Sequence, residues 1–194
     1  MLDVDGVVIS GRPDDGQAWS TSLATDLGID PTRLQTAFFR PYWAQIVTGK
    51  LDLAETLATC LPRVGARISA RDFIDYWFTR DSRINQEVIE DVGLLRAKGI
   101  RVILATNQEH LRAAHLMDAL GLRQHVDGMV YSAQLGARKP ERAFFTAAAA
   151  QVGLSPSSLL LVDDTRANVT AARAAGWRAW FWSGNRRLRD LTDL

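Results

Sequence analysis

Short apolar runs alternate with amphipathic stretches over most of the chain. Five runs are almost continuously apolar, at residues 2–9, 100–105, 128–131, 159–162 and 177–182. Such runs are typical of strands that are buried on both faces of a parallel sheet. Amphipathic stretches between them predict helices at 86–98, at 109–120, from Pro140 to 152, and at 167–175. This β-α-β-α succession predicts an α/β fold with a doubly wound, Rossmann-like parallel sheet.

Residues 14–84 break this succession with a block that is wholly helical in pattern. The expected helices lie near 16–27, 31–47, 53–61 and 70–79. Asp30 before Pro31 and Ser69 three residues before Asp72 are typical helix starts. We expect a small helical-bundle cap domain at 14–84, inserted into an α/β core domain of residues 1–13 and 85–194. A bundle of this size suits a lid over an active site.

Composition and charge exclude several classes of protein. The 194 residues are 47% hydrophobic and carry a net charge of +1, so no strong field attracts nucleic acid. The basic stretch 186–189 is followed at once by Asp190 and Asp193, which favours a solvated tail. Cys60 is the only cysteine and suits a small core residue. No leader pattern or membrane-length apolar run occurs, so we expect a cytoplasmic protein, without a membrane partner, as a monomer or homodimer.

Polar side chains stand at the expected carboxyl ends of strands. They are, in chain order, Asp3 and Asp5, Thr106 and Asn107, Lys139, and Asp163 and Asp164. Open α/β sheets bind ligands outside the carboxyl ends of their strands, so we expect these groups to share one site. Two pairs of acids in one small site repel each other unless a cation neutralises them. Oxygen ligands favour Mg²⁺, and a lysine with a hydroxyl suits a phosphate group.

Taken together, these residues resemble the haloacid dehalogenase-like (HAD) hydrolase superfamily, in particular its phosphatase branch with a helical cap (subfamily IA, C1 cap). Four motifs stand in the family's order: Asp3-Val4-Asp5-Gly6-Val7, Ala105-Thr106-Asn107, Arg138-Lys139-Pro140, and Val162-Asp163-Asp164-Thr165 with Asn168. The resemblance spans essentially the whole chain. It implies a Mg²⁺-dependent phosphatase that hydrolyses a small phosphorylated metabolite through an aspartyl-phosphate intermediate.

The resemblance also implies a role for each matching residue. Asp3 would be the nucleophile, and Asp5 would be the general acid and then the general base. The Thr106 hydroxyl and the Asn107 backbone amide would bind the phosphoryl oxygens, and Lys139 would balance charge. Mg²⁺ would be held by Asp3, the Asp5 carbonyl, Asp163 and Asp164, with Asp164 the clearest ligand and Asn168 as a support.

The individual motifs and the function of the protein also allow other interpretations. Thr106-Asn107 and Asp163-Asp164-Thr165 are also typical of helix starts, and Lys139 before a proline is typical of an exposed lysine. Rival functions on the same fold are a 2-haloacid dehalogenase, a phosphomutase, or a catalytically silent binding protein. Asp5 argues against the dehalogenase, because that reaction has no leaving alkoxide to protonate.

The sequence determines substrate recognition and the extent of the first strand less well than the other features. Arg40 and Trp43 are candidates to contact substrate, although the aromatic stretch 38–43 also suits the core of the helical bundle. Only Met1 and Leu2 precede Asp3, and so short a central strand leaves neighbouring backbone groups unpaired. We therefore expect that the natural start lies upstream or that the strand has been trimmed.

Overall fold

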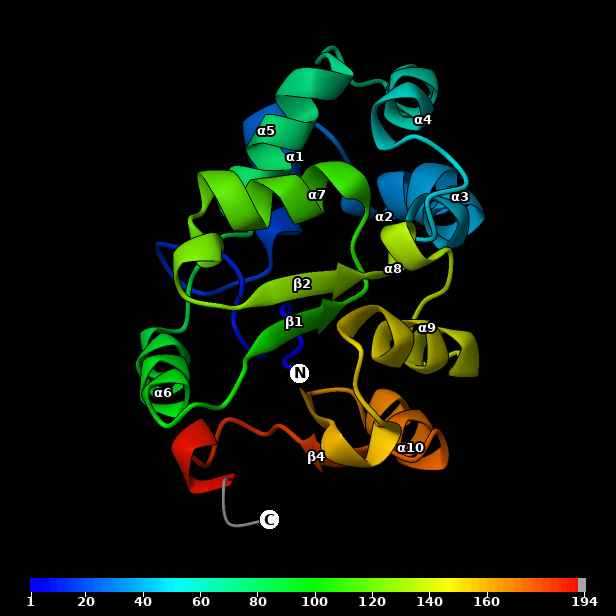
Figure 1. Cartoon of the computed structure of the whole chain (residues 1–194). Coiled ribbons are helices and arrows are strands. Elements are labelled where there is room, and N and C mark those ends of the chain that lie inside the picture. The colour runs from blue at the N-terminus through cyan, green and yellow to red at the C-terminus, as the bar shows by residue number, and fades with distance from the viewer. Residues whose placement is uncertain (192–194) are drawn as a thin grey trace.

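Short parallel strands form the centre of the protein, and the chain has a Rossmann-like α/β fold. The computed structural model describes residues 1–191. The strands are β1 (Ile103–Thr106), β2 (Gly128–Tyr131), β3 (Leu160–Asp163) and β4 (Arg178–Phe181). Strand β1 pairs in parallel with β2, and β3 pairs in parallel with β4. Figure 1 shows helices on both sides of these strands.

The N-terminal segment joins the two pairs into one sheet. The Leu2 amide donates to the Ile103 carbonyl at 2.9 Å, and the Leu2 carbonyl accepts from the Ala105 amide at 2.7 Å. On the other side, the Asp3 amide donates to the Val162 carbonyl at 2.9 Å. Both bridges are parallel, so the order across the sheet is β2, β1, N-terminal segment, β3, β4. Asp3 therefore leaves the sheet at its centre.

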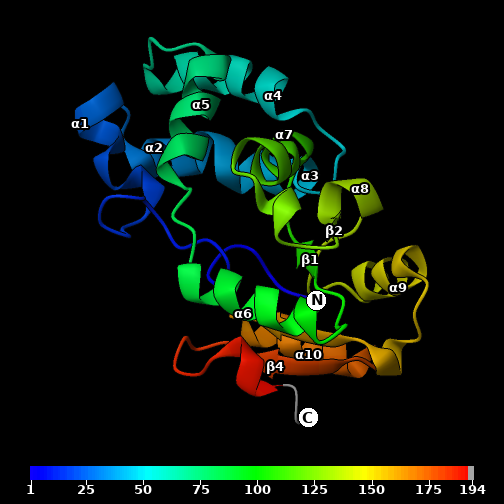
Figure 2. The same ribbon diagram turned by 60° about the vertical axis from the view of Figure 1, so that its left-hand side comes forward.

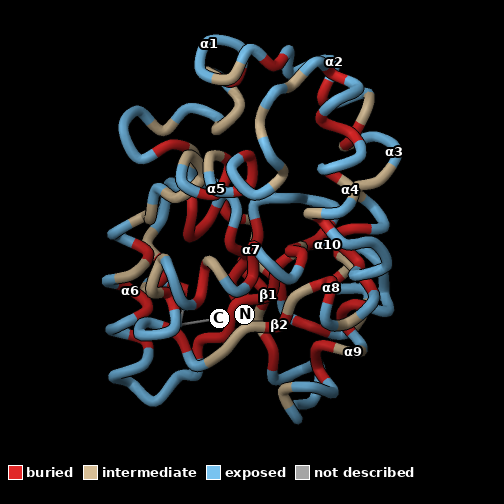
Figure 3. Tube along the Cα trace, turned by 90° about the horizontal axis from the view of Figure 1, so that it is seen from above, coloured by how far each residue is buried: buried red, intermediate tan, exposed pale blue. Residues whose placement is uncertain are grey.

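Alternating side chains of the strands pack against helices on two faces. On one face, Leu104 and Val162 belong to a buried cluster with residues of α6 (Gln86–Ala97). On the other face, Ala105 and Leu161 belong to a cluster with residues of α9 (Arg142–Val152) and α10 (Arg166–Ala174). Figure 3 shows buried positions around β1, in which every residue is buried. This burial on both sides explains why the strands are almost uniformly apolar.

The strand predicted at 2–9 is wrong beyond Asp3, because the chain turns there. The amides of Val8 and Ile9 both donate to the Val4 carbonyl at 2.8 Å. Gly6 has φ of +80°, a left-handed conformation that glycine adopts without steric cost. The strand predicted at 100–105 likewise begins only at Ile103. The turn keeps Asp5 beside the end of the short central strand.

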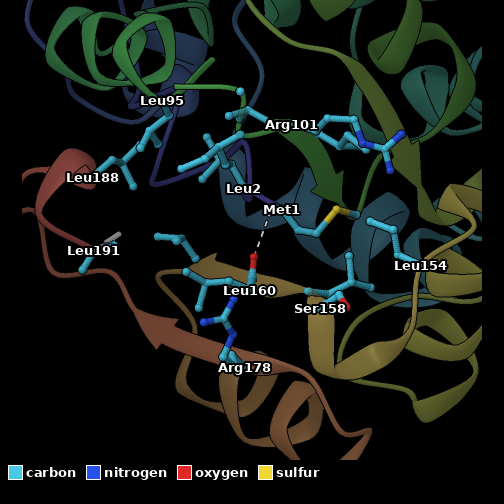
Figure 4. Close-up of a pocket in the computed structure, with 16 residues that line it drawn as sticks. Met1, Leu2, Leu95, Arg101, Leu154, Ser158, Leu160, Arg178, Leu188 and Leu191 are labelled. Carbon is cyan, nitrogen blue, oxygen red and sulfur yellow. Dashed lines mark hydrogen bonds between the residues drawn. The ribbon is translucent and has the colours of Figure 1, made fainter. Parts of the chain in front are cut away.

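The amino group of Met1 lies inside the protein at the opposite end of this strand. It donates to the Leu160 carbonyl at 2.9 Å, as Figure 4 shows. Burial lowers the pKa of this amino group from 8.0 to about 5. Next to Met1 is a cavity of about 450 Å³ between β1 and β3, with Leu95, Val102 and Leu154 among its lining residues. The N-terminal segment therefore pairs with its neighbours from Met1 to Asp3, since the Met1 carbonyl also accepts from the Val162 amide at 2.9 Å.

Residues 14–84, called here the helical insertion, form helices with a hydrophobic core of their own. The helices are α1 (Leu23–Leu27), α2 (Pro31–Leu34), α3 (Arg40–Ile46), α4 (Leu53–Cys60) and α5 (Ala70–Arg80). Phe38, Leu57 and Phe73 are fully buried among them, and Cys60 is a core residue as predicted. Figure 2 shows this group on one side of the sheet-bearing part. No helix within residues 1–191 is long and apolar enough to cross a membrane.

Both predicted helix starts in the insertion are confirmed. The Asp30 carboxylate accepts from the Thr32 amide at 2.8 Å, and the Ser69 hydroxyl accepts from the Asp72 amide at 3.1 Å. These bonds satisfy backbone donors that have no partner within the first turn. The predicted helix at 16–27, by contrast, begins only with a 3₁₀ turn at Trp19–Ser22.

The basic stretch near the C-terminus is anchored, so the prediction of a solvated tail is wrong for it. Arg187 and Arg189 contact Asp91 of α6 at 2.8 and 3.0 Å, and the Asp91 side chain is only 1% exposed. Leu188, which lies between the two arginines in sequence, is buried. A buried carboxylate requires such partners, which hold the stretch against α6. Asp193 lies outside the described residues.

Candidate active site

A buried lysine links two carboxylates that come from different strands. Lys139 Nζ lies 2.9 Å from Asp3 Oδ1 and 2.6 Å from Asp163 Oδ2, and it donates to the Ala105 carbonyl at 2.8 Å. All three charged residues are buried, and Asp163 is completely so. The interpretation of Lys139 as an exposed lysine is therefore wrong. Because the three acceptors surround the ammonium group, its charge is directed at Asp3 and Asp163.

The Asp163 carboxylate accepts hydrogen bonds from Lys139, Thr165 and Asn168. Asn168 Nδ2 donates to its two oxygens at 3.0 and 3.1 Å, and the Thr165 amide donates to Oδ1 at 2.9 Å. Together with Lys139, these donors use most of the acceptor capacity of the carboxylate. Asp163 is thus a fixed negative charge beneath Asp3, and Asn168 acts on the site only through Asp163.

Asp164 is exposed and points toward the turn that carries Asp5. Its carboxylate packs so closely on Gly6 that a Cβ at Gly6 would lie 2.0 Å from Asp164 Oδ2. Oxygens of Asp3, Asp163 and Asp164 lie within 4.8 Å of one another. Opposite ligands of an octahedral Mg²⁺ are about 4 Å apart, and Mg²⁺ prefers oxygen donors. The three residues therefore fit a hard divalent cation in both chemistry and spacing.

Gln108 holds the carboxyl group of Asp5, although no predicted motif included this glutamine. Gln108 Nε2 donates to Asp5 Oδ2 at 2.7 Å and lies 3.4 Å from Thr106 Oγ1. Gln108 is buried, whereas Asp5 opens to solvent. The one signal for Gln108 in the sequence is its position directly after Thr106-Asn107.

Thr106 and Asn107 do not cap the following helix, so that interpretation of the pair is wrong. Glu109 caps α7 (His110–Ala114), because its carboxylate accepts from the Leu111 amide at 2.7 Å. Asn107 instead bonds twice to the backbone of Lys139, with Nδ2 donating to the carbonyl at 2.9 Å and Oδ1 accepting from the amide at 2.8 Å. The side chain of Asn107 therefore fixes the position of Lys139.

Burial dominates the electrostatics of the site. It raises the pKa of Asp3 to about 7, an effect that Lys139 opposes and the negative charge of Asp163 reinforces. The carboxyl groups of Asp5 and Asp164 are desolvated by their neighbours although both residues are exposed overall, and this desolvation raises the pKa of each. Four carboxyl groups thus face one lysine, and a cation at their centre would favour the ionised form of each.

A second cluster lies beside Asp5, where the helical insertion rejoins the core. Arg112 of α7 is buried, and its guanidinium group donates to the carbonyls of Phe78 (3.2 Å) and Asp81. It also lies 3.7 Å from the Asp81 carboxylate. Burial and the negative charge of Asp5 raise the pKa of Asp81 to about 6, which Arg112 opposes. No motif in the sequence indicated this cluster, because Asp81 and Arg112 are 31 residues apart.

The two candidate substrate contacts, Arg40 and Trp43, both belong to α3 of the helical insertion. Arg40 is exposed on α3. Trp43 packs in an aromatic cluster, with its ring centroid 5.6 Å from those of Phe39 and Trp77. Their described contacts do not include Asp3 or Asp5. Both therefore remain predictions as substrate contacts.

The fold and the site define an α/β protein with a lysine-bridged carboxylate centre at the ends of its parallel strands. The family model of the haloacid dehalogenase-like hydrolases matches residues 1–176, and the chain belongs to this family of hydrolases.

Curated relatives carry phosphatase names. The chain is 27% identical to a phosphoglycolate phosphatase of Neisseria gonorrhoeae, over 90% of this chain and 75% of that protein. It is 24% identical to one from Thiobacillus denitrificans, over 100% and 87%. A phosphoglycolate phosphatase of Chromobacterium violaceum is 35% identical over 92 residues, which are 47% of this chain and only 41% of that protein.

Solved structures share the fold at low sequence identity. A HAD family enzyme of Bacteroides thetaiotaomicron, in complex with magnesium and inorganic phosphate, superposes with a TM-score of 0.79 at 17% identity, over 98% of this chain and 96% of that one. An L-2-haloacid dehalogenase of Xanthobacter autotrophicus with covalently bound chloropropionic acid gives 0.66 at 14% identity, over 97% and 78%.

Proposed function

We propose that the protein is a Mg²⁺-dependent phosphatase that hydrolyses a small phosphorylated metabolite through an aspartyl-phosphate intermediate. One observation carries the proposal: the Asp3 carboxylate is bound by buried Lys139, and a second carboxyl, Asp5, is held beside it by Gln108. A nucleophile and a separate proton donor are what phosphate-ester cleavage requires.

The chemistry divides between the two carboxyl groups. Asp3 attacks phosphorus, the new acyl–phosphate bond forms, and the bond from phosphorus to the leaving oxygen breaks. Asp5 gives its proton to that oxygen. Asp5 then takes a proton from water, which attacks the acyl phosphate and releases inorganic phosphate and Asp3. The raised pKa of Asp5 suits a group that carries a proton near neutral pH.

Charge balance assigns the supporting roles. Lys139 neutralises part of the charge of Asp3 and the phosphoryl group, and Asn107 and Asp163 hold Lys139 in place. The Thr106 hydroxyl, close to Gln108, would bind a phosphoryl oxygen. Asp3, Asp164 and the Asp5 carbonyl would hold Mg²⁺. Asp163, also expected as a ligand, lies close enough, but its oxygens already accept from Lys139, Thr165 and Asn168, so in this proposal it supports Lys139 instead. When bound, Mg²⁺ neutralises the negative charge of the phosphoryl group.

We also propose that the helical insertion, residues 14–84, is a cap on the core of residues 1–13 and 85–194, and that the sheet is doubly wound. The separate hydrophobic core of the insertion and the clusters on both faces of the sheet support this division. A cap above Asp5 would exclude water while the ester is cleaved. Phosphoglycolate, named for several relatives, is the first substrate to test.

The decisive experiment is hydrolysis of p-nitrophenyl phosphate and phosphoglycolate with Mg²⁺ and with excess chelator. We expect turnover only with the metal, and a loss of at least about 10³-fold in Asp3→Asn, because the nucleophile is removed. Asp14→Asn is the matched control, since Asp14 is exposed outside the site. Metal-independent turnover, or turnover that survives Asp3→Asn, would refute the proposal. Chloride release from 2-chloropropionate would instead favour the dehalogenase.

A further inference from the structure

Two carboxylates from distant parts of the chain come together where the helical insertion ends. Asp5 follows the central strand, and Asp81 follows α5, the last helix of the insertion. Their negative charges oppose each other. Their closeness is tolerated only with a positive charge nearby, and the buried guanidinium group of Arg112 supplies it to both.

Arg112 also donates hydrogen bonds to the backbone at the end of α5. Its guanidinium group donates to the carbonyls of Phe78 and Asp81, and its centre lies 5.1 Å from the centroid of the Phe78 ring. The side chain is only 4% exposed, which is rare for an arginine unless it is fully partnered. Charge, backbone bonds and ring packing therefore converge on the last turn of α5.

The segment that follows is the return connection to the core. The Arg83 amide donates to the Gly11 carbonyl at 3.1 Å, and the Ser10 amide donates to the Arg83 carbonyl at 2.9 Å. The two connections of the insertion are thus paired with each other. Displacement of the end of α5 would be passed through this pairing to the turn that carries Asp5.

We propose that Arg112 is a positioning residue, which holds the end of the helical insertion against the core and thereby holds Asp5 in place for proton transfer. The part that concerns proton transfer depends on the proposed phosphatase activity. Arg112 itself touches no reacting atom in this proposal. It acts through Asp81, through the connection at residues 81–85, and through its positive charge near Asp5.

Two measurements on Arg112→Met test the proposal. The first is amide hydrogen exchange, in which we expect faster exchange across residues 78–85, by about 10-fold or more, with the rest of the chain unchanged. The second is the ratio of kcat/KM for phenyl phosphate to that for p-nitrophenyl phosphate. Phenolate needs a proton on leaving much more than nitrophenolate does, so we expect this ratio to fall by about 10-fold. A ratio does not depend on how much of the enzyme is folded.

Matched variants separate positioning from general damage. Arg96→Met removes an arginine that also binds an aspartate (Asp127) and two backbone carbonyls, away from the insertion, and should change neither measurement. Arg112→Lys keeps the charge but loses the paired donors, so it should fall between wild type and Arg112→Met. It also serves as the test variant if Arg112→Met does not fold.

Each outcome decides one of the two proposals. Unchanged exchange at residues 78–85, or uniformly faster exchange along the chain, overturns the role of Arg112. Local loosening with an unchanged substrate ratio overturns its link to Asp5. A wild-type protein without Mg²⁺-dependent turnover refutes the phosphatase instead, together with that link, whereas the exchange data still decide whether Arg112 holds the insertion.

Discussion

Gln108 Nε2 donates a hydrogen bond to Asp5 Oδ2 at 2.7 Å, across 103 residues of sequence. The amide nitrogen can only donate, so it stabilises the carboxylate oxygen in one orientation. Gln108 is itself fixed, because its backbone carbonyl accepts from the Ser132 hydroxyl and the Ala133 amide, both at 3.1 Å. The carboxyl group assigned to proton transfer is therefore positioned by a residue outside the recognised motifs.

Replacing Gln108 by methionine should impair turnover without unfolding the protein. The substitution keeps the volume and the backbone bonds and removes the donor to Asp5. We expect kcat to fall by about 10- to 100-fold, at the lower end of what positioned acid–base groups contribute. Steady-state kinetics on phenyl phosphate would measure this effect. Gln151→Met, at an exposed glutamine, is the control, and equal kinetics in the two variants would contradict the prediction.

Replacing Lys139 by methionine should destabilise the fold as well as abolish turnover. Asp3 and Asp163 would then be buried without their cation, and breaking a buried pair in this way costs about 3–5 kcal/mol. Urea unfolding would measure the loss. Added Mg²⁺ should recover part of it, because a cation again neutralises Asp3. Lys98→Met, at an exposed lysine, should change stability by less than about 0.5 kcal/mol.

Replacing Gly6 by alanine should weaken Mg²⁺ binding through Asp164. The new Cβ would lie 2.0 Å from Asp164 Oδ2, so the carboxylate must move away. Gly28→Ala is a close control, because Gly28 has φ of +67° and a Cβ added there would meet no atom within 4 Å. Both variants should lose about 1–2 kcal/mol of stability from backbone strain. Only Gly6→Ala should lose Mg²⁺ affinity in calorimetric titration, and equal affinities would exclude this role for Gly6.

The sequence predicted those helix starts and strands that depend on residues close together in the chain. Asp30 and Ser69 start helices because a side-chain acceptor one turn from a free amide acts within a few residues. The apolar run at 159–162 located β3 to within one residue, because burial on both faces leaves no polar position before Asp163. The run at 128–131 located β2, although only Val130 of this strand is buried. The same rule failed at 2–9, where Gly6 and the backbone bonds to Val4 turn an apolar run into a tight turn.

The sequence by itself also determined the chemistry of the site, since acids, lysine and hydroxyl stand at strand ends in one order. Only the tertiary structure decided which neighbouring residues hold these side chains in position. Asn107 fixes Lys139, Gln108 holds Asp5, and Arg112 binds the end of the insertion. These contacts join residues 31 to 103 positions apart, and no periodicity encodes such distances. A side chain's partner depends on how helices and sheet pack, which is a property of the whole fold.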